Sequence, residues 1–150
     1  MVIYIGSDHR GFKLKEFLKQ YISGTGYEVV DMGNAEYQEG DDYPDFAARV
    51  AKQVSLDPDH TRGIVICASG VGVDIVANKF SRVRSALAAT PEQASASRND
   101  DDTNVLALAA EYLEEEQAKN LVSVWMQTPF SGDERHARRL KKIEQIELER

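Results

Sequence analysis

The sequence has almost no cysteine: Cys67 is the single residue of this type among 150. One cysteine excludes an internal disulfide framework and indicates a reducing compartment. Long apolar runs are also missing, since the longest, residues 63–77, is interrupted by Ser69 and Asp74 and is too short for a membrane span. The first ten residues lack the basic region and apolar core of a signal peptide. We therefore expect a cytoplasmic protein without a membrane partner.

Positive charge is in short supply, because 18 Lys and Arg residues stand against 25 Asp and Glu residues, a formal net charge of −7. Nucleic-acid binding needs a concentrated basic surface, so this balance argues against a nucleic-acid partner. An anionic substrate would have to be held by a local group of cations, since the overall field repels it. Hydrophobic residues make up 42% of the chain. At this length they are enough for one domain with its own core, and no repeat or linker divides residues 1–150.

Short β-branched apolar runs alternate with longer segments of helical periodicity. This alternation predicts an α/β fold of three layers, a five-stranded parallel sheet with helices on both faces. The acidic run 99–102 is interpreted as a solvated loop or a helix cap, because no EF-hand spacing follows it. Expected strands are Val2–Ile5, Tyr27–Val30, Gly63–Cys67, Val83–Ala88 and Asn104–Leu108. Expected helices are Phe12–Ile22, one beginning at Pro44, Val73–Phe80, one opening at Pro91–Ser97, Leu113–Met126 and a charged helix at about 133–149.

Two polar segments follow predicted strands, at the edge where parallel sheets bind ligands. Cys67 ends a buried strand and precedes the turn Ser69-Gly70-Val71-Gly72. Glycines let backbone N–H groups approach a ligand and a helix start favours negative charge, so the turn is suited to a thiolate base beside an oxyanion. The other interpretation is a core thiol beside a tight turn.

The second segment contains Asp8 and His9, just past the first strand. A carboxylate beside an imidazole can exchange protons with sugar hydroxyls, although an Asp cap and a surface His would give the same pattern. In the last helix Arg135 and Arg139 are four residues apart and share one face. Two guanidinium groups can clamp a phosphate, and the alternative is a solvated charged helix.

Taken together, these segments resemble one family along nearly the whole chain, the type B ribose-5-phosphate isomerases, in the group that also contains the galactose-6-phosphate isomerase subunits. The central segment, with its ANK after the glycine turn, is the most specific. The matching text is GSDHRGF at 6–12, YEVVDMG at 27–33, DYP at 42–44, GIVICASGVGVDIVANKF at 63–80, VRSAL at 83–87, DTNVLAL at 102–108 and RHARRL at 135–140.

The resemblance implies a Rossmann-like sandwich, no metal or organic cofactor, and a homodimer or dimer of dimers with an active site shared between subunits. It implies aldose–ketose isomerisation of a sugar phosphate through an enediolate, most directly of ribose 5-phosphate to ribulose 5-phosphate. In similar enzymes the cysteine at the position of Cys67 moves the proton between C1 and C2, and Asp8 assists hydroxyl proton transfers. The remaining roles that the resemblance implies are stabilisation of the intermediate by Ala68, Ser69, Gly70, Val71 and Gly72, a pocket wall at Tyr43, and phosphate binding by His9, Arg135 and Arg139.

Three residues depart from the family pattern. Asp100 and Asp101 stand where the ribose enzymes have a His-Asn pair, which opens the sugar ring and contacts substrate oxygens. We therefore expect Asp100 to take the ring-opening role and Asp101 a substrate-binding role. Glu111 stands where relatives carry a phosphate-binding arginine. These departures leave open a galactose-6-phosphate isomerase subunit, an isomerase of a tetrose phosphate, and a sugar-phosphate-binding protein without activity. The retained Cys67 favours an enzyme, because binding alone needs no thiol base.

Overall fold

A five-stranded parallel sheet forms the centre of the computed structural model, which describes residues 1–149. Its strand order is β2-β1-β3-β5-β4, and each neighbouring pair is parallel. The predicted α/β sandwich, with its Rossmann-like arrangement, is confirmed. The strands are β1 (Val2–Ser7), β2 (Glu28–Asp31), β3 (Thr61–Cys67), β4 (Ser85–Leu87) and β5 (Val105–Ala109).

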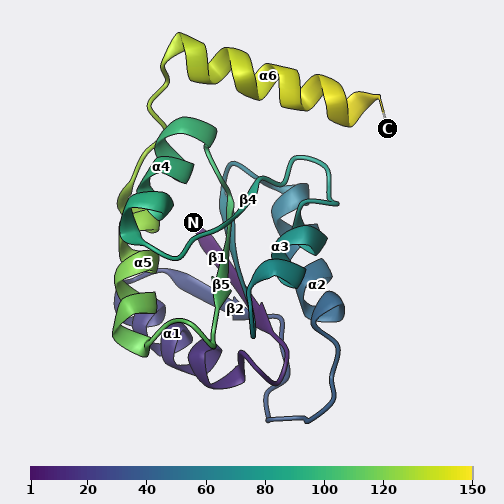
Figure 1. The fold of residues 1–150 in the computed structure, drawn as a ribbon, viewed down its shortest axis with the longest axis vertical. Helices are drawn as coiled ribbons and strands as arrows, with labels where there is room; N and C mark the ends of the chain where they lie inside the picture. The colour runs from purple at the N-terminus through teal and green to yellow at the C-terminus, as the bar shows by residue number, and fades with distance from the viewer. Residues whose placement is uncertain (150) are drawn as a thin grey trace.

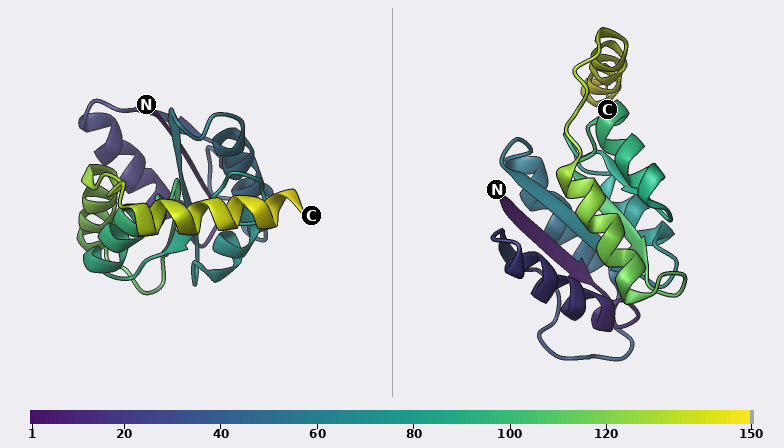
Figure 2. Two further views of the ribbon diagram at one scale, coloured as in Figure 1. Left: turned by 90° about the horizontal axis from the view of Figure 1, so that it is seen from above. Right: turned by 90° about the vertical axis from the view of Figure 1, so that its left-hand side faces the viewer.

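Helices cover both faces of this sheet (Figure 1). One layer contains α1 (Phe12–Gly24), α4 (Pro91–Asp101) and α5 (Glu115–Gln127), and the other contains α2 (Tyr43–Leu56) and α3 (Val71–Ala77). The last helix, α6 (Glu134–Leu148), belongs to neither layer and crosses both of them at one end of the sheet (Figure 2). No helix in residues 1–149 is long and apolar enough to cross a membrane.

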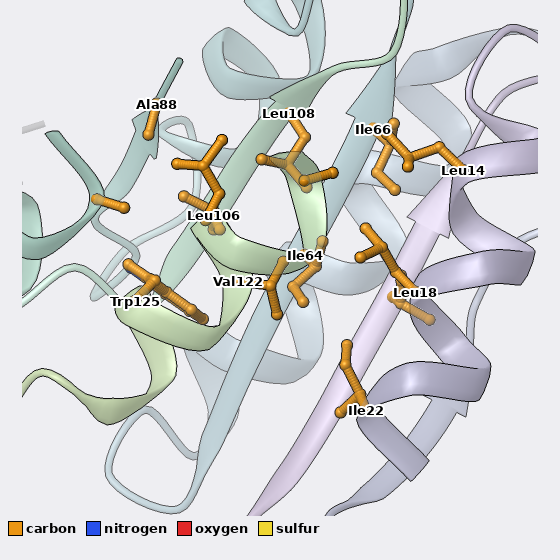
Figure 3. Packing of buried hydrophobic residues seen from close by; sticks show 14 of the residues in the cluster. Leu14, Leu18, Ile22, Ile64, Ile66, Ala88, Leu106, Leu108, Val122 and Trp125 are labelled. Carbon is orange, nitrogen blue, oxygen red and sulfur yellow. The ribbon is translucent and has the colours of Figure 1, made fainter. Parts of the chain in front are cut away.

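The sheet is held by an apolar core on each face. All five residues of β5 are buried, as expected for a central strand covered on both sides. Complete burial of one Leu or Ile side chain contributes about 1.5–3 kcal/mol to folding, so these layers supply most of the stability. The second core, between the sheet and the α2–α3 layer, includes Cys67. Figure 3 shows the first core, in which Leu14, Leu18 and Ile22 of α1 and Val122 and Trp125 of α5 face Ile64, Ile66, Leu106 and Leu108 of the sheet.

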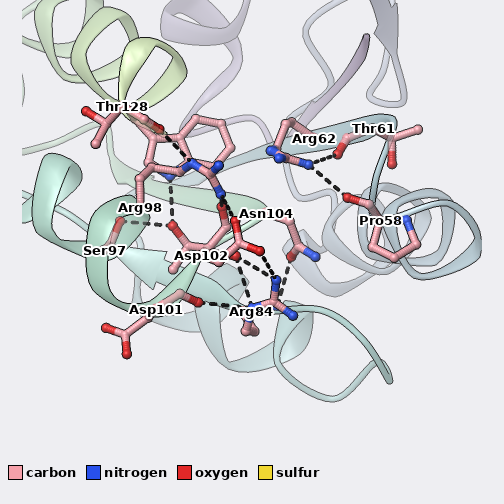
Figure 4. A network of polar contacts seen from close by, with 12 residues as sticks. Pro58, Thr61, Arg62, Arg84, Ser97, Arg98, Asp101, Asp102, Asn104 and Thr128 are labelled. Carbon is pink, nitrogen blue, oxygen red and sulfur yellow. Dashed lines mark hydrogen bonds and ion pairs between the residues drawn. The ribbon is translucent and has the colours of Figure 1, made fainter. Parts of the chain in front are cut away.

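The prediction of a loop at 99–102 is wrong for residues 99–101, which form the last turn of α4, whereas the alternative of a helix cap is confirmed at Asp102. Asp102 has a left-handed backbone, φ 46°, and its carboxylate accepts hydrogen bonds from Arg98 at 2.7 Å and Arg84 at 2.9 Å (Figure 4). Arg98 lies one turn earlier on α4 and Arg84 just before β4. These two ion pairs stabilise a helix end that the local polar composition does not reveal.

Other boundaries differ by one to three residues. The third helix begins at Val71 and ends at Ala77 instead of covering 73–80, since Asn78 turns its side chain to the backbone of Ser85 and Asp74. The fourth strand is shorter than 83–88, because the Arg84 N–H bonds to the Asn104 side chain and not to a strand carbonyl. The other predicted strands and helices are present with small shifts at their ends.

Candidate active site

The strand order reverses direction between β1 and β3, which makes this pair the topological switch of the sheet. The chain passes from β1 to β2 on one side, and β3 then adds on the other side of β1. In the register of this pair Ser7 lies opposite Ile66. The next residues, Asp8 and Cys67, therefore lie side by side at the carboxyl edge of the sheet. The sequence prediction that both segments lie just past strands at the same edge of the sheet is confirmed.

Cys67 lies at the end of β3 with only 5% of its surface exposed. Its Sγ accepts a hydrogen bond from the Gly70 N–H at 3.2 Å, so the turn points a donor at the sulfur. Gly70 has φ 74°, and a Cβ there would lie 2.5 Å from Leu87 Cδ1 and 3.0 Å from the carbonyl carbon of Leu108. Glycine is therefore required for this turn geometry. The sulfur belongs to the core on one side and to the polar turn on the other.

Two residues of this turn are open to solvent. Ser69 and Val71 are exposed, and the Ser69 Oγ accepts a hydrogen bond from the Val71 N–H at 3.4 Å. Tyr43, the first residue of α2, lies over Gly72, where a Cβ would be 2.6 Å from the phenol ring. The structure thus places Tyr43 beside the turn, where the family resemblance predicts a residue of the pocket wall.

Asp8 is buried, with 6% of its surface exposed, and one carboxylate oxygen accepts hydrogen bonds from the N–H groups of Arg10 and Gly11, both at 3.1 Å. These two bonds close the turn before α1, whose N-cap is Gly11 and not Asp8, so the alternative of an Asp cap is wrong. Burial raises the pKa of Asp8, and the neighbouring charge of Asp41 raises it further, while the two N–H groups and His9 oppose this effect only in part. A buried carboxyl with a raised pKa is suited to carry protons between substrate oxygens.

His9 has a partner that the sequence did not reveal. Asp41 Oδ1 lies 2.9 Å from the ring Nδ1 and also accepts a hydrogen bond from the His9 backbone N–H at 2.7 Å. The two residues are 32 positions apart, and Asp41 comes from the acidic stretch between β2 and α2. The DYP motif at 42–44 follows Asp41 directly. It was the sequence signal for this contact, because the family resemblance places Tyr43 in the wall of the pocket.

Glu111 forms an ion pair with Arg10, so the acid that departs from the family pattern is matched by a local cation. The Glu111 N–H donates to the Ala68 carbonyl at 3.0 Å, which places this pair beside the Cys67 turn. Lys13 and Glu115 form a second, looser pair nearby, at 3.6 Å. These residues line a groove of about 510 Å³ between the starts of α1 and α5.

The other predicted site residues lie at the opposite end of the sheet. Asp101 and α6 border a cavity of about 310 Å³ together with Ser85, the first residue of β4. Asp100 Oδ1 lies 3.7 Å from His136 Nε2 in the same region. A seven-residue strand such as β3 spans about 20 Å. Within one chain, Asp100, Asp101, Arg135 and Arg139 therefore do not meet Cys67, whereas Asp8, His9, Tyr43 and residues 67–72 come together.

Known proteins resemble this chain along nearly its full length. A family model described as Ribose/Galactose Isomerase matches residues 3–143. The ribose-5-phosphate isomerase B of Escherichia coli is 38% identical over 148 residues, which cover 99% of this chain and 97% of the relative. A crystal structure of ribose-5-phosphate isomerase B from Mycoplasma genitalium with bound ribulose-5-phosphate is 37% identical and superimposes with a TM-score of 0.96, covering 99% and 97% of the two chains. The corresponding enzyme of Clostridium thermocellum is 40% identical, with a TM-score of 0.94 and 99% of both chains covered. The resemblance seen in the sequence motifs is confirmed, and the chain belongs to the ribose/galactose isomerase family.

Proposed function

We propose that this protein is an aldose–ketose isomerase that interconverts ribose 5-phosphate and ribulose 5-phosphate. The observation that carries the proposal is the placement of Cys67 and Asp8 at the switch point of the sheet, next to a turn whose N–H reaches the sulfur. Relatives named ribose-5-phosphate isomerase B match almost the whole chain, and one such structure holds ribulose-5-phosphate. These likenesses support ribose 5-phosphate over galactose 6-phosphate or a tetrose phosphate.

The proposed reaction moves one proton between two neighbouring carbons. The Cys67 thiolate removes the C2 proton of the open-chain aldose, and the electron pair forms an enediolate whose oxygen is stabilised by N–H groups of the turn. Asp8 transfers the hydroxyl proton from O2 to O1, and the Cys67 thiol then returns its proton to C1. The sulfur ends as it began, so no redox partner is consumed. A free thiol is kept reduced in the cytoplasm, where we place the enzyme.

The complete site is proposed to be shared between two copies of the chain. The guanidinium groups of Arg135 and Arg139 are exposed on α6, at the end of the sheet remote from Cys67. They can act on the same sugar phosphate only if they reach the carboxyl edge of a partner subunit. Ile143 and Ile146 of α6 are 40% and 58% exposed, which gives this helix an apolar surface suited to a homodimer contact.

The role of the sulfur is tested by the substitution Cys67→Ala. We expect kcat to fall by about 10³-fold or more, since a lost acid–base group costs 10²–10⁴-fold, while the free energy of unfolding changes by only about 1 kcal/mol. The measurement is solvent deuterium exchange at C1 and C2 of ribose 5-phosphate, with urea denaturation as the stability control. Cys67→Ser, which keeps the shape of the side chain, should be nearly as inactive. Turnover within threefold of wild type in either variant would exclude the thiol as the base.

The substrate is tested in the same assay with galactose 6-phosphate and erythrulose 4-phosphate. The proposal requires the highest kcat/KM with ribose 5-phosphate. Faster exchange with the tetrose phosphate would instead indicate that Asp100 and Asp101 replace the His-Asn pair because the substrate does not cyclise. Binding of all three without exchange would identify a non-catalytic member of the family.

A further inference from the structure

The contact between His9 and Asp41 is tighter than a surface ion pair. A single oxygen, Asp41 Oδ1, is 2.9 Å from the ring Nδ1 and 2.7 Å from the backbone nitrogen of the same histidine. The Asp41 side chain is only 9% exposed and that of His9 21%. An ionised carboxylate can only accept hydrogen bonds, so Nδ1 must carry a proton in this arrangement. The ring is then oriented with Nε2 as the nitrogen left for a ligand.

Asp41 is itself held in place by a chain of contacts that ends in the core. Its second oxygen, Oδ2, accepts a hydrogen bond from Asn34 Nδ2 at 3.0 Å. The Asn34 carbonyl accepts one from Lys15 Nζ at 2.9 Å, and Lys15 is completely buried on α1. The connection between β2 and α2 is therefore anchored to α1 at Asn34 and to the end of β1 at Asp41.

Tyr37, from the same connection, completes the surroundings of the ring. Its ring lies edge-on to His9 with 6.2 Å between centroids, and edge-on to Phe12 at 6.1 Å. His9 thus has a carboxylate on one nitrogen and an aromatic ring against it. Both neighbours come from a segment about 30 residues further along the chain.

We propose that Asp41 is a positioning residue, which holds the Nδ1–H of His9 and orients the ring so that, in the doubly protonated imidazolium, the Nε2–H donates to the anionic end of the substrate. This inference rests on the proposed function and on the phosphate-binding role that the family resemblance implies for His9. A hydrogen bond to a charged group contributes enough to change ligand affinity about tenfold or more. The alternative is that Asp41 only holds the connection between β2 and α2 against the end of β1. In that case its substitution lowers stability and leaves the tautomer of the His9 ring unchanged.

The deciding variant is Asp41→Asn, which keeps the shape of the side chain but removes its charge. Two matched controls are available: Asp42→Asn changes the exposed neighbouring acid, and Asn34→Ala removes the amide that donates to Asp41 Oδ2 while keeping the Asp41 carboxylate and the backbone carbonyl that binds Lys15. Imidazole ¹⁵N spectra at about pH 8.5, where histidines are mostly neutral, report the tautomer. The chain has 3 histidines, and a His9→Gln spectrum assigns the signal.

We expect His9 to be protonated at Nδ1 in the wild type and in both controls, and to shift toward the Nε2-protonated form in Asp41→Asn. At about pH 6, where imidazolium is abundant, the KM of that variant for ribose 5-phosphate should rise about tenfold with kcat within threefold, because the cation loses the carboxylate that orients it. The dissociation constant of inorganic phosphate at this pH, followed on the His9 signal, should rise in parallel. An unchanged tautomer would overturn the proposal, as would a changed tautomer with unaltered KM and phosphate affinity. A wild-type protein without turnover would contradict the proposed function alone, because the tautomer and phosphate titration need no catalysis.

Discussion

Lys15 is completely buried on α1, and its ammonium group is held by Asp31 Oδ2 at 2.6 Å and by the Asn34 carbonyl at 2.9 Å. Glu16 Oε1 is a further acid at 3.1 Å, but removing Asp31 takes away the shortest ion pair of a buried charge, which is costly. We therefore expect Asp31→Asn to lower the free energy of unfolding by about 3 kcal/mol at pH 7. Urea denaturation measures this loss. Glu116→Gln, which breaks the exposed pair with Lys119, serves as the control and should cost no more than about 0.5 kcal/mol.

The cost of Asp31→Asn depends on pH in a direction that follows from its surroundings. Burial by itself raises the pKa of Asp31, but hydrogen bonds from Lys15, Lys19 and the Gly33 N–H outweigh it, so the pKa is lowered. An acid with a lowered pKa in the folded state contributes stability above its ordinary value, and this contribution is lost as pH falls through the folded pKa. The difference between wild type and variant should therefore shrink below about pH 4. A constant difference from pH 7 to pH 2 would contradict this assignment.

At the residue scale, the parts of the site that follow a strand were predictable and their partners were not. Asp8 and Cys67 could be placed because any residue just past a parallel strand lies at the ligand-binding edge. Asp41 could not, since its contact with His9 depends on how the connection between β2 and α2 folds back over 32 residues. Nor does helical periodicity reveal that Lys15 is buried, because the acid that compensates it comes from β2.

At the element scale, the connection from β1 to α1 meets the connection from β5 to α5 through Arg10 and Glu111. We expect Arg10→Glu to raise the KM for the sugar phosphate about tenfold, because it adds negative charge at the edge where an anion has to bind. Adding Glu111→Arg restores a cation at the neighbouring position, beside Ala68, and should return KM to within about threefold of wild type.

Kinetic assays of Arg10→Glu, Glu111→Arg and the double variant measure how KM responds when the two charges change places. Lys13→Glu is the control, since its side chain is 91% exposed and pairs loosely with Glu115 in the same groove. It should change KM by less than about threefold, because an exposed charge is screened. A double variant no better than Arg10→Glu alone would show that the cation must come from the connection between β1 and α1.

Element types were easier to predict from the sequence than element ends. The alternation of β-branched runs with helical periodicity was enough to predict all five strands. The inner strand β5 is buried on both faces and almost entirely apolar, whereas β2 and β4 lie at the edges of the sheet and are partly exposed. For the end of α4 the sequence left a loop and a helix cap as alternatives. It could not decide between them, because Asp102 is stabilised by an arginine before β4 as well as by one on its own helix. Such a cap depends on side chains that are remote in the chain.

At the scale of the whole molecule, the residues predicted for one site lie at opposite ends of a single chain. Cys67 is at the carboxyl edge, whereas α6 lies by the amino-terminal ends of β3 and β4, where the Arg82 N–H donates to Glu147 at 3.0 Å. No periodicity in the sequence predicts where a terminal helix docks. The separation nevertheless has a consequence that can be measured, because a shared site can be assembled from two different defective chains.

We expect Cys67→Ala and the double variant Arg135→Ala/Arg139→Ala to be nearly inactive separately and to regain activity when they are unfolded together and refolded as a mixture. If each site takes its sulfur from one subunit and its arginines from the other, a mixed dimer contains one intact site and one doubly defective site. Random pairing makes about half of the dimers mixed, so about a quarter of the wild-type activity should return. Mixing the folded variants without unfolding is the control and should restore activity only as fast as subunits exchange. A refolded mixture with no more activity than the sum of the two variants would mean that the arginines of α6 do not serve the Cys67 site of a partner.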